Sequence, residues 1–366
     1  MRLGSDDRER FESALLDVRK SVYEYLKAPD YGRRFLPPDV YEAVYSYIDA
    51  GGKTLRPAVL LFSCGAVGGD EAIALPAAAA VEVYHTWTLV HDDIIDRDDK
   101  RRGHPTIHKQ FRDKAAQMYH YATMEAQHYG LSVAILTGDL QQGWATELLC
   151  ELYRKHGLDP AVALSLISDL KMNVQCTLIE GEMLDIWYAK QDIESLSESL
   201  IVEMLWKKTG ALYEFAGRAG AMIGLETPHP DHELVGALSR FASQCGTAFQ
   251  LQDDILGIVG DEERLGKPVG SDIREGKRTT VIYYALKNAR EAQRTQLLSI
   301  LGNETASGEE ISQTINLLRD LGGIEKTRDL ARSYVKEAMA YLDHVPASRY
   351  KSLLSTWAEY MVERAF

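Results

Sequence analysis

The amino-acid sequence predicts an all-α protein, built as a bundle of ten or more helices. Apolar residues recur at the three- and four-residue spacing of a helix along most of the chain. Runs of β-branched residues with the two-residue alternation of a strand are scarce. Glycine and proline pairs, such as Pro37-Pro38 and Gly322-Gly323, separate the helical stretches. Since no linker of biased composition interrupts the chain, we expect one domain over residues 1–366.

The helical stretches can be followed from the N-terminus. Apolar residues at helical spacing predict a first helix over residues 11–26. The apolar stretch 72–90 is interrupted by a proline, a glutamate and a histidine, so we interpret it as a buried helix and not as a membrane span. We interpret residues 112–130, which are rich in Tyr, His and Met, as an extra helix. Further helices are predicted over 330–342 and 353–361.

The composition is that of an ordinary globular chain with an acidic balance. Apolar residues make up 45% and charged residues 26%, and 41 basic against 54 acidic residues leave a net charge of −13. A general nucleic-acid binder would carry a basic surface, so we expect no nucleic-acid partner. The four scattered cysteines lack metal-ligand spacing, which favours reduced thiols in a cytoplasmic protein. The first residues show no apolar signal region.

Two acidic clusters follow apolar helical stretches and resemble each other. Asp92 and Asp96 are four residues apart, so a helix places them on one face. Like charges at this spacing repel, and the C-terminus of a helix disfavours anions further. Mg²⁺ takes one or two carboxylates together with phosphates and water. A solvated acidic helix end is the alternative, and the candidate Mg²⁺ ligands are Asp92, Asp93, Asp96, Asp253 and Asp254.

Basic elements accompany the acidic clusters. Lys-Arg-Arg-Gly at 100–103 follows the first cluster, and Gly-Lys-Pro at 266–268 and Glu-Gly-Lys-Arg at 275–278 follow the second. The element Gly-Gly-Lys-Thr-Leu-Arg-Pro at 51–57 is not a P-loop, because the pattern Gly-x-x-x-x-Gly-Lys-Ser/Thr is absent. Each element alone is also typical of a solvated loop. Together with the acidic clusters, they predict a metal-bridged diphosphate site.

These motifs together resemble those of the trans-polyprenyl diphosphate synthases, of the short-chain geranylgeranyl or farnesyl diphosphate type. The resemblance implies an isoprenoid-synthase-type bundle around a central cavity, a homodimer, and Mg²⁺, of which we expect three per active site. The matching motifs occur in the family's order across about residues 45–280. They are Gly-Gly-Lys-Thr-Leu-Arg-Pro (51–57), His-Asp-Asp-Ile-Ile-Asp (91–96), Arg-Arg-Gly-His-Pro-Thr (101–106), Thr-Gly-Asp-Leu (137–140), Lys-Thr-Gly (208–210), Phe-Gln-Leu-Gln-Asp-Asp (249–254) and Leu-Gly-Lys-Pro-Val-Gly-Ser-Asp-Ile-Arg-Glu-Gly-Lys (265–277).

The resemblance also implies a role for each matching residue. Asp92 and Asp96 match the first Mg²⁺-binding pair, and Asp253 matches the ligand of a further Mg²⁺. The expected contacts of the allylic diphosphate are Arg101, Lys208, Lys267 and Lys277. The expected contacts of isopentenyl diphosphate are Lys53, Arg56, His85 and Arg102. Thr209 and Gln250 match positions that stabilise a carbocation, so the expected catalytic residues are Arg101, Lys208, Thr209 and Gln250.

The reaction that the resemblance implies is a head-to-tail condensation of isopentenyl diphosphate with an allylic diphosphate. Neutralising the leaving diphosphate with Mg²⁺ and basic side chains allows the C–O bond to ionise. The allylic cation then alkylates the double bond of isopentenyl diphosphate, and a proton is lost. Water has to be excluded because it would quench the cation.

Product length is expected to depend on the helix before the first acidic cluster. Trp87 and Tyr84 lie five and eight residues before Asp92, about 7.5 and 12 Å along a helix axis. They are three residues apart and so share a face. Large residues in the family pattern act here as a cavity floor, with simple core aromatics as the alternative. We therefore predict a short product, geranylgeranyl diphosphate first and farnesyl diphosphate next.

Three positions depart from the family pattern. Gly257 stands where many members carry a third aspartate, Glu182 where glutamine is usual, and Gln141 where an apolar residue is common. These departures concern substrate preference more than reaction class. The stretch 112–130 is also longer than the connection usual in the family, so we expect an insertion there. A terpene cyclase of the same fold and a partner subunit of a heteromeric synthase are the alternative functions. The isopentenyl-site motifs argue against the first, and the complete set of aspartates argues against the second.

Overall fold

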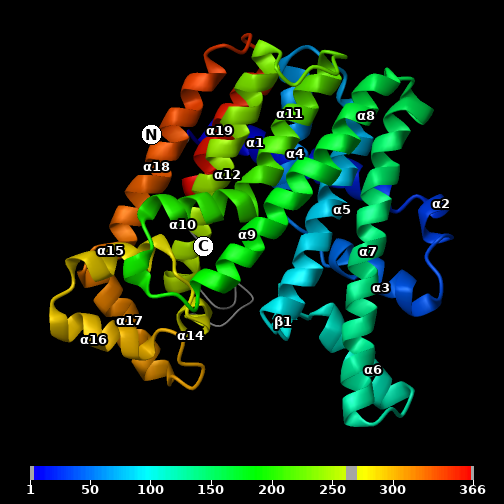
Figure 1. Ribbon diagram of the computed structural model, residues 1–366. Helices are drawn as coiled ribbons and strands as arrows, with labels where there is room; N and C mark the ends of the chain where they lie inside the picture. The colour runs from blue at the N-terminus through cyan, green and yellow to red at the C-terminus, as the bar shows by residue number, and fades with distance from the viewer. Residues whose placement is uncertain (1–3, 261–269, 364–366) are drawn as a thin grey trace. The chain divides into compact units, whose positions relative to one another are not determined.

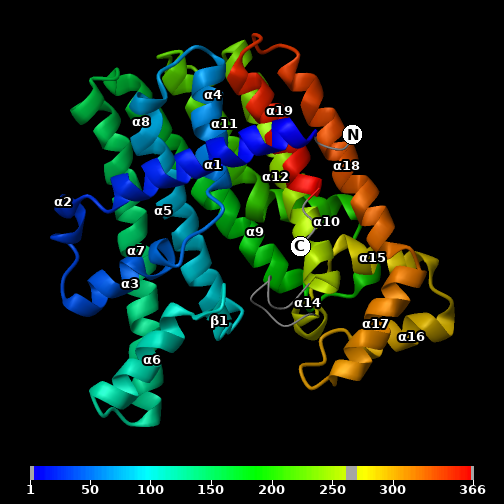
Figure 2. The same ribbon diagram turned by 180° about the vertical axis from the view of Figure 1, so that it is seen from behind.

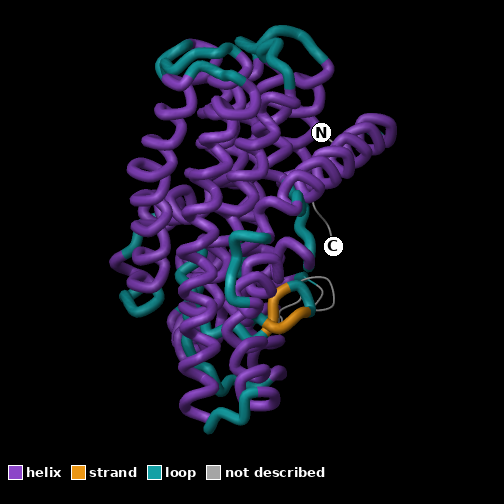
Figure 3. Tube along the Cα trace, turned by 90° about the vertical axis from the view of Figure 1, so that its right-hand side faces the viewer, coloured by secondary structure: helices purple, strands orange, loops and turns teal. Residues whose placement is uncertain are grey.

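The computed structural model describes residues 4–260 and 270–363, and its regular structure is almost entirely helical. This confirms the predicted all-α class with more than ten helices. Figure 3 shows one short hairpin of strands among the described helices, formed by β1 (Lys100–Arg101) and β2 (His104–Pro105).

The chain divides into two compact units. The first, called here the N-terminal unit, comprises Arg8–Ile167 and Ala219–Pro230. The second, called the C-terminal unit, comprises Met1–Asp7, Ser168–Arg218 and Asp231–Phe366, within the described ranges. The expectation of a single domain over the whole chain stays a prediction.

The N-terminal unit is organised around two long helices, α5 and α7, which pack along each other and against α4 and α6 (Figure 1). Its elements are α1 (Ser5–Leu26), α2 (Pro29–Gly32), α3 (Pro38–Asp49), α4 (Leu55–Ala66), α5 (Glu71–Ile95), the β1–β2 hairpin, α6 (Ile107–Met118), α7 (Thr123–His156) and α8 (Pro160–Ser168).

The sequence of α5 explains its start and its burial. The carboxylate of Asp70 caps the helix by accepting a hydrogen bond from the backbone N–H of Ala72 at 2.9 Å. Residues 77–80 are four alanines without exposed surface, which lets neighbouring helices approach closely. On length and composition alone, Glu71–Ile95 and Pro160–Tyr188 could each cross a membrane. The structure buries 72% of the apolar window of the first, as the sequence predicted.

Residues 112–130 comprise the end of α6, a short connection at 119–122 and the start of α7, so the prediction of one extra helix here is wrong. Asp39 of α3 ties this segment to the rest of the unit. Its carboxylate accepts hydrogen bonds from Lys114 at 2.8 Å, Tyr119 at 2.9 Å and Tyr129 at 2.5 Å. Whether the segment is an insertion relative to the family stays a prediction.

The C-terminal unit is built on α12, which packs against α18 and α19 (Figure 2). Asp253 and Asp254 lie within α12 and not at its end, because the helix continues to Val259. The elements are η1 (Asp169–Val174), α9 (Gln175–Tyr188), η2 (Ile193–Ser195), α10 (Glu198–Leu205), η3 (Trp206–Gly210), α11 (Ala211–Gly224, which runs on into the N-terminal unit), α12 (Glu233–Val259), α14 (Ser271–Glu275), α15 (Thr280–Asn288), α16 (Glu291–Ile300), α17 (Gly308–Asp320), α18 (Gly323–Leu342) and α19 (Arg349–Glu363).

Candidate functional site

The first acidic cluster lies at the C-terminal end of α5. Asp92 belongs to the last turn, and Asp96 caps the helix, with its backbone N–H donating to the Asp92 carbonyl at 2.8 Å. The chain then turns back through the β1–β2 hairpin, in which Arg101 pairs with His104. The hairpin returns a guanidinium group to the acidic end of the helix.

Arg101 and Asp93 form a buried ion pair beside this cluster. Arg101 Nε and Nη2 donate to Asp93 Oδ1 at 2.8 and 2.5 Å, and Nη2 is 3.9 Å from Asp92 Oδ2. The phenol of Tyr47 also donates to Asp93, while its oxygen accepts from the backbone N–H of Ile107 at 3.3 Å. Burial by itself lowers the pKa of Arg101, but the ion pair with Asp93 outweighs it and raises that pKa. Arg101 is therefore a fixed cation next to Asp92.

A second basic group surrounds Glu82, in the middle of α5. The Glu82 side chain is buried and accepts a hydrogen bond from Tyr23 Oη at 3.4 Å. Burial raises the pKa of Glu82, and the nearby charges of Arg102 and Arg56 oppose this rise. Arg102 also packs on the chain before α4, where a Cβ on Gly52 would lie 3.0 Å from Arg102 Nη1. Two arginines far apart in sequence thus meet at one buried carboxylate.

His85 lies one turn further along α5, near the same arginines. Burial and the positive charges of Arg56 and Arg102 lower the pKa of His85 well below its ordinary value, against the opposing charge of Asp92. The ring is therefore neutral at pH 7. A neutral imidazole between two guanidinium groups can donate a hydrogen bond to a bound phosphate. Lys53 is exposed in the loop before α4.

Tyr84 and Trp87 pack against each other on α5, with ring centroids 4.8 Å apart and an edge-to-face geometry. Both are buried. The indole Nε1 of Trp87 donates to Nδ1 of His91 at 3.1 Å, and His91 Nε2 lies 3.4 Å from the carbonyl oxygen of Ile135. The aromatic pair is therefore linked to the face of α5 that packs on α7.

In the C-terminal unit, Lys208 lies in η3, a π-helical segment, and such segments are frequent at functional sites. Its Nζ is 2.6 Å from Asp185 Oδ2 and 2.9 Å from Glu182 Oε2. Lys277 Nζ is 4.0 Å from the same oxygen of Asp185. This close approach of α9 and η3 requires glycine at 181, because a Cβ there would lie 2.3 Å from the backbone nitrogen of Lys208.

Thr209 and Gln250 are in direct contact. Thr209 Oγ1 donates to Gln250 Oε1 at 2.7 Å, and Gln250 Nε2 donates to Asp254 Oδ1 at 2.9 Å. Burial, together with the negative charges of Asp272 and Asp253, raises the pKa of Asp254 well above its ordinary value. Within the described residues, Asp254 Oδ2 accepts no hydrogen bond. A cation at this position would favour the ionised carboxylate.

Gly257 stands where a third aspartate of the second cluster was expected from the family pattern. Because glycine has no side chain, the carboxylate of another residue can approach this position. A Cβ at residue 257 would lie 2.8 Å from Oδ2 of Asp272, which comes from α14. An aspartate at 257 would have to displace that side chain.

The donor set of both clusters suits a hard divalent cation. In the described part of the chain, no group of three or more His, Cys, Asp or Glu side chains converges as a ready metal site. Mg²⁺ needs no such group, because it is commonly held by one or two carboxylates and completes its shell with substrate phosphates and water. The carboxylates of Asp92 and Asp96, and the buried oxygen of Asp254, fit this mode of binding.

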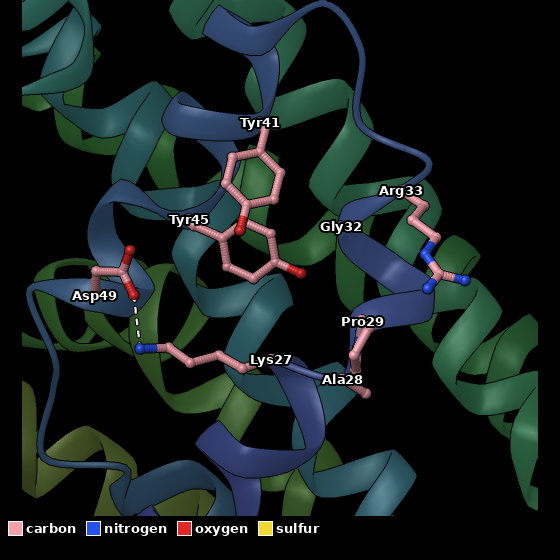
Figure 4. Close-up of a pocket in the computed structure, with 8 residues that line it drawn as sticks. All are labelled: Lys27, Ala28, Pro29, Gly32, Arg33, Tyr41, Tyr45 and Asp49. Atoms are coloured by element: carbon pink, nitrogen blue, oxygen red, sulfur yellow. Dashed lines mark ion pairs between the residues drawn. The ribbon is translucent and has the colours of Figure 1, made fainter.

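A pocket of ≈ 490 Å³ opens elsewhere on the N-terminal unit. Figure 4 shows Tyr41 and Tyr45 on one side of it and an ion pair of 2.7 Å between Lys27 and Asp49 on another. None of the residues expected from the sequence to bind substrate lines this pocket.

Lys267, which the sequence predicted as a phosphate contact, lies outside the described residues. Other contacts of the site were not predicted from the sequence. Sequence reasoning missed Tyr47, Glu82 and Asp185 as partners of the predicted site residues. Glu82 was noted only as an interruption of an apolar helix, although a carboxylate there predicts a buried cation nearby. Asp185 lies three residues after Glu182, so on a helix the two share a face.

Comparison with known proteins identifies relatives over most of the chain. The polyprenyl synthetase family model matches residues 37–318. The geranylgeranyl diphosphate synthase of Sulfolobus acidocaldarius is 35% identical over 92% of both chains. The geranylfarnesyl diphosphate synthase of Aeropyrum pernix is 33% identical over 87% of this chain and 92% of its own. The crystal structure of geranylgeranyl pyrophosphate synthase from Corynebacterium glutamicum, complexed with isoprenyl diphosphate and magnesium, has a TM-score of 0.82 at 28% identity, covering 96% of this chain and 99% of that one.

Proposed function

Because this chain belongs to the polyprenyl synthetase family and is therefore a prenyltransferase, we propose that it makes geranylgeranyl diphosphate, with farnesyl diphosphate as the next candidate. It does so by condensing isopentenyl diphosphate head to tail with an allylic diphosphate. The observation that carries the proposal is the fixed cation Arg101, 3.9 Å from Asp92 at the end of α5. At this end of the helix, carboxylates that can bind a metal ion lie beside a guanidinium group that can bind phosphate oxygens.

Mg²⁺ is the proposed cofactor, held by Asp92 and Asp96 in one cluster and by Asp253 with Asp254 in the other, with three ions per active site. When bound, it supplies Lewis-acid neutralisation of the diphosphate charge. Both oxygens of Asp93 accept hydrogen bonds from Arg101. Asp93 is one of the proposed metal ligands, but we favour a different role for it, which is to hold Arg101 in place.

The allylic diphosphate is proposed to bind Arg101, Lys208, Lys267 and Lys277. Lys208 is supported here by its ion pairs with Glu182 and Asp185, which fix its ammonium group. Glutamate at 182 adds a negative charge next to Lys208 that the glutamine usual in the family would not. This charge holds the Lys208 ammonium group in place and offsets some of its attraction for phosphate.

Isopentenyl diphosphate is proposed to bind Lys53, Arg56, His85 and Arg102. The neutral state of His85 supports this assignment, because a neutral imidazole donates one hydrogen bond without adding a further charge to two arginines. Glu82 interacts electrostatically with both arginines, and its negative charge reduces the repulsion between them before substrate arrives.

Thr209 and Gln250 are proposed to stabilise the allylic cation. The hydroxyl proton of Thr209 is used in the hydrogen bond to Gln250, so the lone pairs of its oxygen remain available to a positive charge. The oxygen is also fixed in place before the reaction, since Gln250 is held by Asp254.

The length of the product is proposed to be limited by Trp87 and Tyr84. Their mutual packing and burial support a rigid floor. A geranylfarnesyl diphosphate product is a further candidate after farnesyl diphosphate, because one relative at 33% identity carries that name. Replacing Trp87 and Tyr84 by alanine is expected to lengthen the products.

We also propose a homodimer, located in the cytoplasm. Large apolar side chains stay exposed on α7, where Ile135, Leu136 and Leu140 are 48%, 55% and 38% exposed. On α9, Met183 and Trp187 are 58% and 60% exposed. Groups of large exposed apolar side chains on one helix are typical of subunit interfaces. Analytical ultracentrifugation is expected to show a dimer, and Leu136→Glu is expected to shift it toward the monomer.

The purified protein, incubated with Mg²⁺, isopentenyl diphosphate and allylic primers of increasing length, tests the reaction. Consumption of isopentenyl diphosphate separates a synthase from a terpene cyclase, which would consume only the allylic substrate. Asp92→Ala and removal of Mg²⁺ by a chelator are both expected to abolish consumption. A protein that never consumes isopentenyl diphosphate is not a synthase.

A further inference from the structure

The indole of Trp87 has one polar group, and that group has a specific partner. Trp87 is 6% exposed, and its Nε1–H donates to Nδ1 of His91 at 3.1 Å. The two rings meet edge to face, with centroids 5.9 Å apart. A buried indole N–H needs an acceptor, because its lost hydration is otherwise uncompensated. The acceptor on His91 therefore fixes the rotamer in which the indole is buried.

His91 is itself held by α7. Because Nδ1 accepts the indole hydrogen bond, the neutral ring carries its proton on Nε2. That atom lies 3.4 Å from the carbonyl oxygen of Ile135. The imidazole can approach α7 this closely because residue 138 is glycine. A Cβ at 138 would lie 2.1 Å from His91 Nε2 and 2.6 Å from its Cδ2, closer than non-bonded atoms allow.

We propose that His91 and Gly138 are positioning residues for product length. They form a continuous chain of contacts from the α7 backbone through the imidazole to the Trp87 indole. The indole in turn packs on Tyr84. This inference rests on the proposed function, because it takes Trp87 as part of the floor that stops the growing prenyl chain. Loss of the His91 acceptor, or displacement of His91 from α7, releases the indole and lengthens the product.

Two substitutions of His91 separate the acceptor from the bulk of the ring. His91→Phe keeps a ring but removes the acceptor. It is expected to raise the ratio of longer to main product by about fivefold, the change in preference that one ordinary hydrogen bond produces. His91→Asn places an oxygen close to the position of Nδ1 and is expected to restore the wild-type ratio. The ratio is measured per isopentenyl diphosphate consumed, so that a change of overall rate does not affect it.

Two glycines of α7 give a matched pair of variants. Gly138→Ala forces His91 away and is expected to lengthen the products as His91→Phe does. Gly143→Ala makes the same change on the same helix, where the added Cβ would meet no atom within 4 Å beyond its chain neighbours and the nearby backbone of α7. It is expected to leave the ratio unchanged. The emission of Trp87, taken as the difference between each protein and its Trp87→Phe counterpart, is expected to shift to longer wavelength in Gly138→Ala and to stay unchanged in Gly143→Ala.

The possible failures can be told apart. A wild-type protein that consumes no isopentenyl diphosphate overturns the proposed function and this inference with it. If Trp87→Ala makes products of wild-type length, Trp87 is no floor and the inference is also wrong. If Trp87→Ala lengthens the products while His91→Phe and Gly138→Ala do not, only the role of His91 and Gly138 is overturned. The same holds if His91→Asn lengthens the products as much as His91→Phe.

Discussion

Replacing Asp93 by asparagine tests the buried ion pair beside the first acidic cluster. The side chains of Asp93 and Arg101 are 1% and 17% exposed, so the substitution leaves a guanidinium cation largely cut off from water. Removing one partner of a buried ion pair costs about 3–5 kcal/mol. Asp92 remains 3.9 Å from Arg101 and compensates in part. We therefore expect a loss of about 3 kcal/mol in the free energy of unfolding.

Thermal unfolding followed by circular dichroism at a fixed scan rate measures this loss. One kcal/mol shifts Tm by about 2–4 °C in a chain of 150–250 residues, so about 3 kcal/mol corresponds to roughly 6–12 °C or somewhat less in this longer chain. Tyr47→Phe removes a neutral donor to the same carboxylate, together with the acceptor of the Ile107 N–H, and is expected to cost about 1.5–3 kcal/mol. The double variant Asp93→Asn, Arg101→Met removes both charges and is expected to regain part of the loss, because uncharged replacements of both partners are often tolerated.

Two outcomes would refute this reasoning. One is an Asp93→Asn protein with the Tm of the wild type, which would mean that Arg101 is well solvated without its partner. The other is a double variant less stable than Asp93→Asn alone, which would mean that the cost does not arise from an uncompensated charge on Arg101.

Three further predictions concern the substrate site. Glu82→Gln is expected to raise KM for isopentenyl diphosphate about tenfold with a smaller change in kcat, since it removes the carboxylate that interacts with Arg56 and Arg102. The control for general destabilisation is Glu151→Gln, because Glu151 is also a buried carboxylate and accepts a hydrogen bond from Tyr31 at 2.6 Å. An equal effect of the two substitutions on KM would contradict the assignment of Glu82 to this site. Thr209→Val is expected to lower kcat about 10²-fold in steady-state kinetics, as loss of one preorganised dipole does, and an unchanged kcat would remove Thr209 from the mechanism. The lowered pKa of His85 means that the unfolded chain binds a proton that the folded chain excludes. Below pH 6.5 the free energy of unfolding is therefore expected to fall by up to about 1.4 kcal/mol per pH unit. Denaturant titrations should show a shallower fall in His85→Gln, and an identical pH dependence of the two proteins would contradict the neutral ring.

Helix positions were largely predictable because their periodicity is local. The stretch 72–90 is rich in alanine and other apolar residues, which predicted one continuous buried helix. In the structure, this stretch lies within α5. The break at 119–122 was not predictable, since it contains neither glycine nor proline. It is made by His120, whose φ of 58° is unusual for a residue with a side chain. The continuation of α12 past Asp254 was likewise not predicted, because Gly257 is a residue typical of helix ends, although the structure keeps it inside the helix.

The candidate site was predictable in its chemistry more than in its contacts. The four-residue spacing of Asp92 and Asp96 determines that they share a face, whatever surrounds them. The partnership of Asp93 with Tyr47 joins residues 46 positions apart, and no local pattern predicts it. The link from His91 to Gly138 similarly depends on how α5 packs on α7. Such contacts are set by tertiary packing, which periodicity does not report.

The central claim is that this protein elongates an allylic diphosphate with isopentenyl diphosphate and stops at a short product. The most direct measurement is mass spectrometry of the products made with Mg²⁺, isopentenyl diphosphate and farnesyl diphosphate as primer. We predict addition of a single isoprene unit, giving geranylgeranyl diphosphate as the main product. Unchanged isopentenyl diphosphate would contradict the reaction, and products that pass beyond geranylgeranyl length would contradict the floor formed by Trp87 and Tyr84.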